Sequence, residues 1–491
     1  MDRLPPELIT KILGYCPRGR PSRGRPCLAP YALISKQWQQ IVERLVFSSI
    51  RLKSSELGHF ANVYGAELEQ IHRRSALQQL KYTIEPTPGT DEALESEIAT
   101  ERTIARQEAT EAVMFSLGEL YSILSSWSTN KTITLEIGFP QETCLSKAAT
   151  ELIPRTKLVK RFEFKSTAQR DPVLLASIAS QMIGLQDIKW ELDDYDKNIN
   201  SVSRRKARYD FSKQVQSLVE ICPSLRTIEL RFVNETPSDE NIAVPSILLP
   251  HVPVDHLSQS LKLLSSMTDL RTLVLHSVVL SEQFFQQSKL SSRSPMWPSL
   301  SRLEINYSPM AADGGWFFER EPNTVGIEQY RNLVSRRLVL ERIHKTQEDQ
   351  AKITNFDQEY EPARQDDENE DLDDAEWGDV FRTWPSQRLE AMLISMAQVA
   401  GQMPALRIFT ASSDMPDCAA YQLFQFLYLV PGEIDAGCLL DFTHDSEHRH
   451  QRRLYWRVPS SWRMNEELGR AWSDLLGEDG VIEYHDWYGR E

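Results

Sequence analysis

The chain has 491 residues, of which 41% are hydrophobic and 9% aromatic, so it has ample length and apolar content for a globular core and is not a wholly disordered protein. A formal net charge of −15 argues against broad nucleic-acid binding, and six scattered cysteines without a Cys-x-x-Cys pair suit a reducing compartment and argue against a zinc finger. Because no apolar run approaches the ~20 residues of a membrane span and the start lacks a signal-peptide segment, we expect a cytosolic or nuclear protein without a membrane partner.

The first predicted elements are two short amphipathic helices near the start of the chain. Pro5 and Pro6 suit the opening turn of a helix, where backbone N–H groups have no internal partner, and the helix dipole favours Glu7 at the same place. Apolar residues then recur at helical spacing, first at Leu8, Ile9, Ile12 and Leu13, and again at Tyr31, Ile34, Trp38, Ile41 and Leu45. Two helices of this size cannot bury these faces alone, so something else must cover them.

Residues 4–52 resemble an F-box, the helical module that joins substrate receptors to a cullin–RING ubiquitin ligase. The opening Leu-Pro-x-Glu-Leu pattern is present, Ile34-Ser35-Lys36-Gln37-Trp38 matches the pattern of the second helix, and residues 47–52 resemble the strand that follows it in fungal members. The resemblance implies binding to the S-phase-kinase-associated adaptor, and through it to a cullin, by a set of residues that comprises Leu4, Pro5, Leu8, Ile9, Ile12, Ile34, Trp38 and Val42. The alternative is that both helices only cap the apolar end of the next domain.

Between these helices, residues 17–27 are longer and more basic than the usual F-box turn. They contain Arg-Gly-Arg-Pro twice, which resembles the core of an AT-hook, a segment whose arginines enter the narrow minor groove of A·T-rich DNA. The Lys/Arg run that flanks true hooks is missing, and a solvated loop or part of a nuclear-import signal would look the same. A DNA-associated protein therefore stays as an alternative function.

The next elements, over residues 54–127, alternate between helix and strand. Residues 54–78 predict a helix and residues 80–84 a strand, and the turn-forming residues 86–89 end this part. A helix from residue 91 to about residue 106 is polar nearly all round, and residues 113–127 become apolar. We expect the polar half to be a solvated arm and the apolar half to pack.

Five later segments share the pattern Leu-x-x-Leu-x-Leu and begin at Leu185, Leu225, Leu270, Leu300 and Leu406. Helical stretches precede them, often with a turn containing Pro, and weaker copies occur at Ile133 and Phe162. Helix, tight turn and short strand form the unit of a leucine-rich repeat, and the segments resemble the irregular repeats that follow many F-boxes. The spacings are uneven and the expected Asn or Cys after the strand is absent, so a plain helix-on-sheet α/β layer is the alternative.

In such a stack the residues between the apolar positions face outward and could hold a target. Four strand starts carry an arginine, and a row of guanidinium groups would favour an acidic or phosphorylated segment. The predicted target-binding residues are Arg226, Glu229, Arg271, Arg302 and Arg407, and ordinary solvated charges are the alternative.

The last part of the chain contains an insertion and an aromatic-rich tail. Residues 327–352 predict an exposed charged helix, and residues 366–379 carry nine carboxylates and no basic residue, which predicts disorder. Residues 421–430 predict a buried helix or strand, and residues 439–442 and 453–458 a strand pair joined by a turn with His444, His448 and His450. Those histidines lack further ligands, so we expect no metal and no cofactor.

Taken together, these features predict an α/β protein with a small N-terminal F-box followed by an irregular leucine-rich-repeat-like solenoid. The expected divisions are residues 1–52 (F-box), 53–130 (start of the solenoid), 131–310 (repeats), 311–387 (insertion) and 388–491 (last repeats and cap). No catalytic motif is recognisable, so we expect a non-catalytic substrate receptor that binds the adaptor at one end and an unidentified target at the other. A plain interaction scaffold remains the other alternative.

Overall fold

A computed structural model of the chain describes residues 4–15, 28–65, 71–86, 99–127, 131–139, 153–164, 172–194, 201–233, 244–250, 252–286, 296–319, 382, 384–414, 423–434, 447–459 and 462–486. The predictions for the basic segment 17–27, the charged helix 327–352, the acidic segment 366–379 and the strand 439–442 lie outside these residues. The chain forms two compact units, one made of Met1–Leu192 with Glu220–Leu225 and the other of Asp193–Val219 with Arg226–Glu491. Their boundary falls inside the division expected over residues 131–310.

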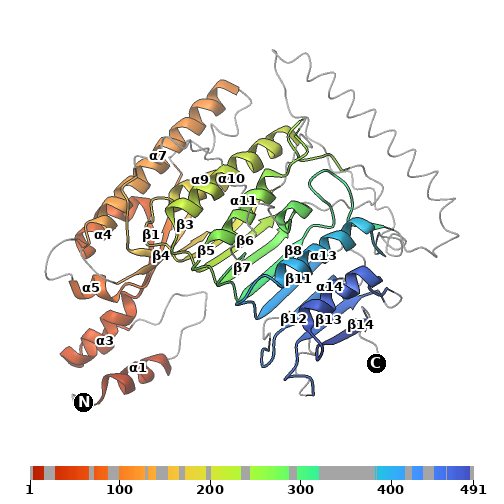
Figure 1. The fold of residues 1–491 in the computed structure, drawn as a ribbon. Coiled ribbons are helices and arrows are strands. Elements are labelled where there is room, and N and C mark those ends of the chain that lie inside the picture. Colours follow the sequence, from red (N-terminus) through yellow and green to blue (C-terminus); the bar gives the residue numbers. More distant parts are fainter. Residues whose placement is uncertain are drawn as a thin grey trace, which may run out of the picture. The chain divides into compact units, whose positions relative to one another are not determined.

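The first unit begins with the N-terminal helices and continues into a parallel sheet (Figure 1). The helices are α1 (Pro6–Tyr15), α2 (Ala29–Ala32) and α3 (Lys36–Val46). The sheet has the order β1-β2-β3-β4-β5, and its strands are parallel: β1 (Ser49–Lys53), β2 (Gln79–Thr83), β3 (Ile133–Gly138), β4 (Val159–Phe164) and β5 (Asp187–Asp193). The connections contain η2 (Ser54–Glu56), α4 (Leu57–Tyr64), α5 (Ile71–Ala76), α7 (Ala99–Ser125) and α9 (Pro172–Ala179).

The second unit is a mixed sheet with helices on one face (Figure 1). Its strand order is β6-β7-β8-β11-β12-β13-β14, with bounds Thr227–Val233, Thr272–Val278, Arg302–Tyr307, Ile408–Asp414, Leu423–Leu429, Arg453–Val458 and Val481–Asp486. The strands β6, β7, β8 and β11 are parallel, whereas β12 is antiparallel to both neighbours. The helices are α10 (Ser201–Ile221), α11 (His256–Leu263), α13 (Gln387–Ala400) and α14 (Glu466–Leu476), with short elements η4 (Leu264–Ser266), η5 (Glu282–Phe284), β9 (Phe318–Glu319) and β10 (Trp384–Pro385).

A recurring turn explains how the Leu-x-x-Leu-x-Leu segments enter their strands. The N–H of Leu225 donates to the Cys222 carbonyl, and Leu300 and Leu406 make the equivalent bond three residues back, to Trp297 and Met403. Proline occupies the second position of all three turns, where its fixed φ is already correct for a β-turn. Each anchoring leucine is buried, so the turn brings the chain from the helix layer into the sheet with the leucine facing the core.

Alternating burial shows that these strands have one covered face. In β6, Ile228, Leu230 and Phe232 are buried, while Thr227, Glu229 and Arg231 between them are not. The same alternation holds in β5 and β8. Period-2 burial is what a sheet with helices over one face requires. The strands predicted at all five segments and at Ile133 and Phe162 are confirmed, and so is the coarse α/β class.

Other predictions gain detail from the structure. The sequence allows either a helix or a strand over residues 421–430, and the structure shows the strand β12 there. Among the described residues β13 pairs with β12 and β14, which were not predicted as its partners. The described part of the polar arm, from Ala99 onward, and the apolar segment that follows it belong to one continuous helix, α7.

Aromatic rings fill the core of the last strands. Trp456 of β13 lies 5.3 Å from Trp462 and 5.9 Å from Trp472 of α14, measured between ring centroids, and Phe426 of β12 lies 4.7 Å from Trp472. All four side chains are buried. Trp456, Trp462 and Trp472 are therefore core residues, and Trp472 fixes α14 on the sheet.

Candidate binding surface of the N-terminal helices

The N-terminal helices form a small core of their own. Ser35 precedes α3 and its hydroxyl accepts a hydrogen bond from the Trp38 N–H at 3.4 Å, which is an N-cap. Trp38 and Val42 then project from α3 and pack with Ile9 and Leu13 of α1, and all four are buried. The packing is completed by partly buried residues, which are Leu4, Leu28, Tyr31, Ala32, Ile41 and Leu45.

Two further contacts fix how α1 and α3 meet. The side-chain amide of Gln37 donates to the carbonyl of Leu4 at 3.0 Å, which links the chain two residues before α1 to the first turn of α3. The rings of Tyr31 and Trp38 are stacked with centroids 6.4 Å apart. The module is thus held together by the apolar cluster around Trp38 and by the hydrogen bond from Gln37 to Leu4.

A second side of α1, next to the side that faces the core, is apolar and exposed. Leu8, Ile12 and Tyr15 follow one another at helical spacing, with 47%, 43% and 78% of their surface accessible. Leu33 and Ile34, between α2 and α3, are also exposed, Leu33 to 88%. We call these five residues the apolar patch. Large exposed apolar side chains grouped on so few elements are typical of a protein–protein interface.

The predicted adaptor-binding residues divide between these two environments. Ile9, Trp38 and Val42 lie in the core of the module, and Leu8, Ile12 and Ile34 lie in the apolar patch. Leu4 is partly buried and Pro5 is exposed. Tyr15 and Leu33 were not in the predicted set. The spacing of seven residues from Leu8 was a signal for Tyr15, whereas Leu33 lies in an irregular segment that periodicity does not describe.

The predicted arginine row in the second unit is less regular than expected. Backbone hydrogen bonds link Arg226 to Arg271, Arg271 to Ser301 and Ser301 to Arg407, so these residues share one register position. Arg302 lies one residue further along and pairs in register with Thr272. Because side chains alternate between the faces of a sheet, Arg302 does not extend the row formed by the others.

Two of the five predicted target-binding residues are engaged in ion pairs. Arg302 bonds to Glu304 at 2.8 Å, and Arg407 pairs with Glu433. Glu229 is half-buried and has a partner. Arg226 and Arg271 are exposed, and no ion pair of theirs is recorded within the described part of the chain. These two arginines are the best remaining candidates for contact with an acidic target.

The described residues contain no group of three or more His, Cys, Asp or Glu side chains that could hold a metal ion. Of the predicted histidine cluster, His448 and His450 lie in the described part of the chain, and Nδ1 of His448 lies 2.9 Å from the amide oxygen of Gln451. None of the described helices is both long and apolar enough to cross a bilayer.

Comparison with known proteins adds no assignment. Protein-family models gave no match to this chain, and curated protein sequences gave none either.

Proposed function

We propose that this chain is a non-catalytic substrate receptor of a cullin–RING ubiquitin ligase, with residues 4–52 acting as an F-box. In this proposal the module binds the S-phase-kinase-associated adaptor, and the strands with their helices form an irregular leucine-rich-repeat-like solenoid that holds a target protein. The proposal places the protein in the cytosol or nucleus.

The observation that carries the proposal is the division of apolar residues in the N-terminal helices. Ile9, Leu13, Trp38 and Val42 form the internal core, whereas Leu8 and Ile12 are large apolar residues that remain about half exposed. A helix that only capped the following sheet would bury its second face against that sheet. An exposed second face instead favours a partner that covers it.

The proposed target surface is the region around Arg226 and Arg271. Adjacent parallel strands bring these two guanidinium groups to one register position, where they could bind a carboxylate or phosphate of the target. Replacing both with Gln should weaken target retention without changing adaptor binding.

The test uses Leu8→Ala together with Ile12→Ala. Each side chain is about half accessible in the free chain, so a partner would bury the remaining half, and we expect a loss of roughly 1–2 kcal/mol per site. Together these losses correspond to a Kd for the adaptor that is weaker by roughly 30- to 1,000-fold. Calorimetric titration of the purified chain with the adaptor measures this directly.

A matched control comes from the same unit. Ile104 and Phe115 of α7 are also large, apolar and exposed, to 58% and 68%, but lie outside the module. Ile104→Ala with Phe115→Ala should leave adaptor binding unchanged. If the wild-type chain does not bind the adaptor, the ligase assignment is lost and the plain scaffold takes its place.

The alternative of a DNA-associated protein depends on residues 17–27, which lie outside the described residues. The same preparation tests it, because an AT-hook would bind A·T-rich duplex with an affinity that falls steeply with salt.

A further inference from the structure

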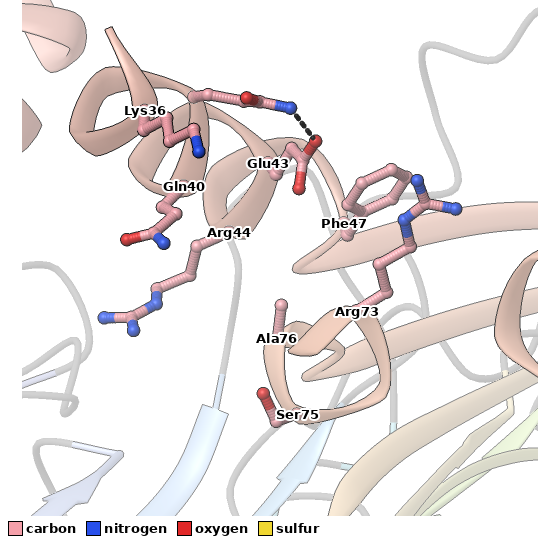
Figure 2. A pocket seen from close by; sticks show the side chains of 9 residues that line it. Lys36, Gln40, Glu43, Arg44, Phe47, Arg73, Ser75 and Ala76 are labelled. Carbon is pink, nitrogen blue, oxygen red and sulfur yellow. Dashed lines mark hydrogen bonds between the residues drawn. The ribbon is translucent and has the colours of Figure 1, made fainter. Parts of the chain in front are cut away.

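A polar groove runs along the side of α3 that faces away from the module's core (Figure 2). Its volume is about 430 Å³, and its walls come from α3, from Phe47 after it, and from the end of α5. Lys36, Gln40 and Arg44 follow at helical spacing along one side, and Arg73 and Ser75 of α5 lie across from α3. An eleven-residue helix is about 16 Å long, so the groove could hold about five residues of an extended chain.

The lining is positive although the whole chain is strongly negative. It contains the three cations Lys36, Arg44 and Arg73 against the single carboxylate of Glu43. Within the described residues none of the three cations has a recorded ion pair, and Nε of Arg73 is buried without a hydrogen-bond partner. Lys131 adds a further ammonium nearby, since it donates to the backbone carbonyl of Ser75.

The remaining contacts hold the groove in shape. The guanidinium of Arg73 lies 5.1 Å from the centroid of the Phe47 ring, a cation–π contact that fixes its position. Glu43 accepts a hydrogen bond from the Gln39 amide at 3.0 Å, which Figure 2 shows, so its carboxylate stays on the α3 wall. The positive groups are therefore spaced apart, with amides and one negative group between them.

We infer that this groove binds an acidic peptide segment of a partner protein. Spaced carboxylates of a peptide would meet Lys36, Arg44 and Arg73 separately, while Gln39 and Gln40 offer amide groups to its backbone. A nucleic acid fits less well, because its evenly charged backbone would bring a phosphate to Glu43. A membrane surface fits less well too, because the cations line a concavity. The inference concerns a surface other than the apolar patch and stands whether or not the adaptor binds.

The experiment measures fluorescence polarisation of a short labelled peptide of alternating Glu and Ala, titrated with the full chain at low salt. Lys36→Glu with Arg44→Glu should weaken binding by about tenfold or more, since both side chains are exposed and neither carries packing. Glu43→Gln should tighten binding by a few-fold, because it removes the one repulsive group. A gain of affinity cannot come from misfolding, which keeps the test decisive.

The matched control is Lys11→Glu with Arg51→Glu, two exposed cations of the same unit outside the groove, which change the net charge equally. The peptide with Gln in place of Glu should not bind. The inference is overturned if the control pair weakens binding as much as the groove pair, or if Glu43→Gln has no effect. It is also overturned if a single-stranded oligonucleotide of equal charge displaces the peptide and binds more tightly, since that result would indicate a general polyanion site.

Discussion

Replacing Arg208 with Met would test whether a buried ionic network holds the second unit together. The guanidinium of Arg208, on α10, bonds to Asp194 at 2.5 Å, to Asp255 at 3.4 Å and to the Val279 carbonyl at 2.9 Å. All three charged side chains are buried. Burial alone lowers the pKa of Arg208, but the two carboxylates outweigh it and raise the pKa above its ordinary value.

The expected loss of stability depends on which partners Asp194 and Asp255 keep after the substitution. Removing one partner of a buried ion pair typically costs about 3–5 kcal/mol, because the remaining charge has lost its compensation. Here Asp194 would keep Arg204 at 3.2 Å, and Asp255 would keep the Leu257 N–H that it caps at 3.2 Å. Both carboxylates thus retain a partner, so we expect a loss of stability at the lower end of this range, about 3 kcal/mol.

Differential scanning calorimetry at neutral pH would measure this as a fall in Tm of about 6 °C or more. The matched control is Arg470→Met, which removes an exposed ion pair to Glu466 on α14 and should cost less than about 1 kcal/mol. Adding Asp194→Asn and Asp255→Asn to Arg208→Met should restore part of the loss, since Asn also caps a helix. If Arg208→Met behaves like Arg470→Met, the network does not hold the unit.

Three further predictions concern single residues. Burial raises the pKa of Asp313, but hydrogen bonds from Arg388 and from the Gly315 N–H outweigh burial and lower the pKa below its ordinary value. The ionised carboxylate therefore stabilises the fold above about pH 4, and this stabilisation is lost as the pH falls. Asp313→Asn should lower the free energy of unfolding by about 0.5–1 kcal/mol at pH 7, and by less below pH 4, as measured by denaturant titration. A loss that is the same at both pH values would contradict this prediction. Burial raises the pKa of the Cys222 thiol to about 11, so iodoacetamide at about pH 8 should label this cysteine only after the protein unfolds. Peptide mass spectrometry measures the labelling, and rapid labelling of the native protein would contradict the burial of Cys222. Gly314→Ala should destabilise the protein by about 2 kcal/mol or more in thermal melts, because φ of Gly314 is +88° and a Cβ would lie 2.3 Å from the Val244 carbonyl oxygen. The control is Gly469→Ala in α14, where a Cβ meets nothing within 4 Å, and this change should stabilise the protein by about 0.5–1 kcal/mol.

The strands could be predicted because their signal is local. A leucine at the anchor and apolar residues at the third and fifth positions after it report the buried face directly, and the preceding Pro reports the turn. Pairing could not be predicted in the same way. For example, β13 pairs with β12 and β14, and these contacts are set by backbone hydrogen bonds between segments that share no sequence pattern. The offset of Arg302 from Arg226 and Arg271 already follows from the aligned leucines, and a shift of one residue reverses the face that a side chain occupies.

The candidate site was predictable as a set of residues but not as an arrangement. Periodicity showed that Leu8, Ile9 and Ile12 are apolar, but it could not say which of them face Trp38 and which face outward. That choice depends on where α3 packs. The groove was not found from sequence at all, because Arg73 and Lys36 belong to different helices and give no joint pattern along the chain.

The geometry of α3 allows the two proposed binding events to be separated experimentally. One side of this helix carries Val42 into the core, the other side carries Lys36 and Arg44 into the groove, and Ile34 of the apolar patch lies just before it. Val42→Ala should therefore disturb both events, because it loosens the helix that positions both surfaces, at a cost of roughly 2 kcal/mol for a buried valine. A patch variant should affect only the adaptor, and a groove variant only the acidic peptide. If groove variants instead abolished adaptor binding and patch variants abolished peptide binding, the two surfaces would form one continuous interface, and the acidic segment would belong to the adaptor itself.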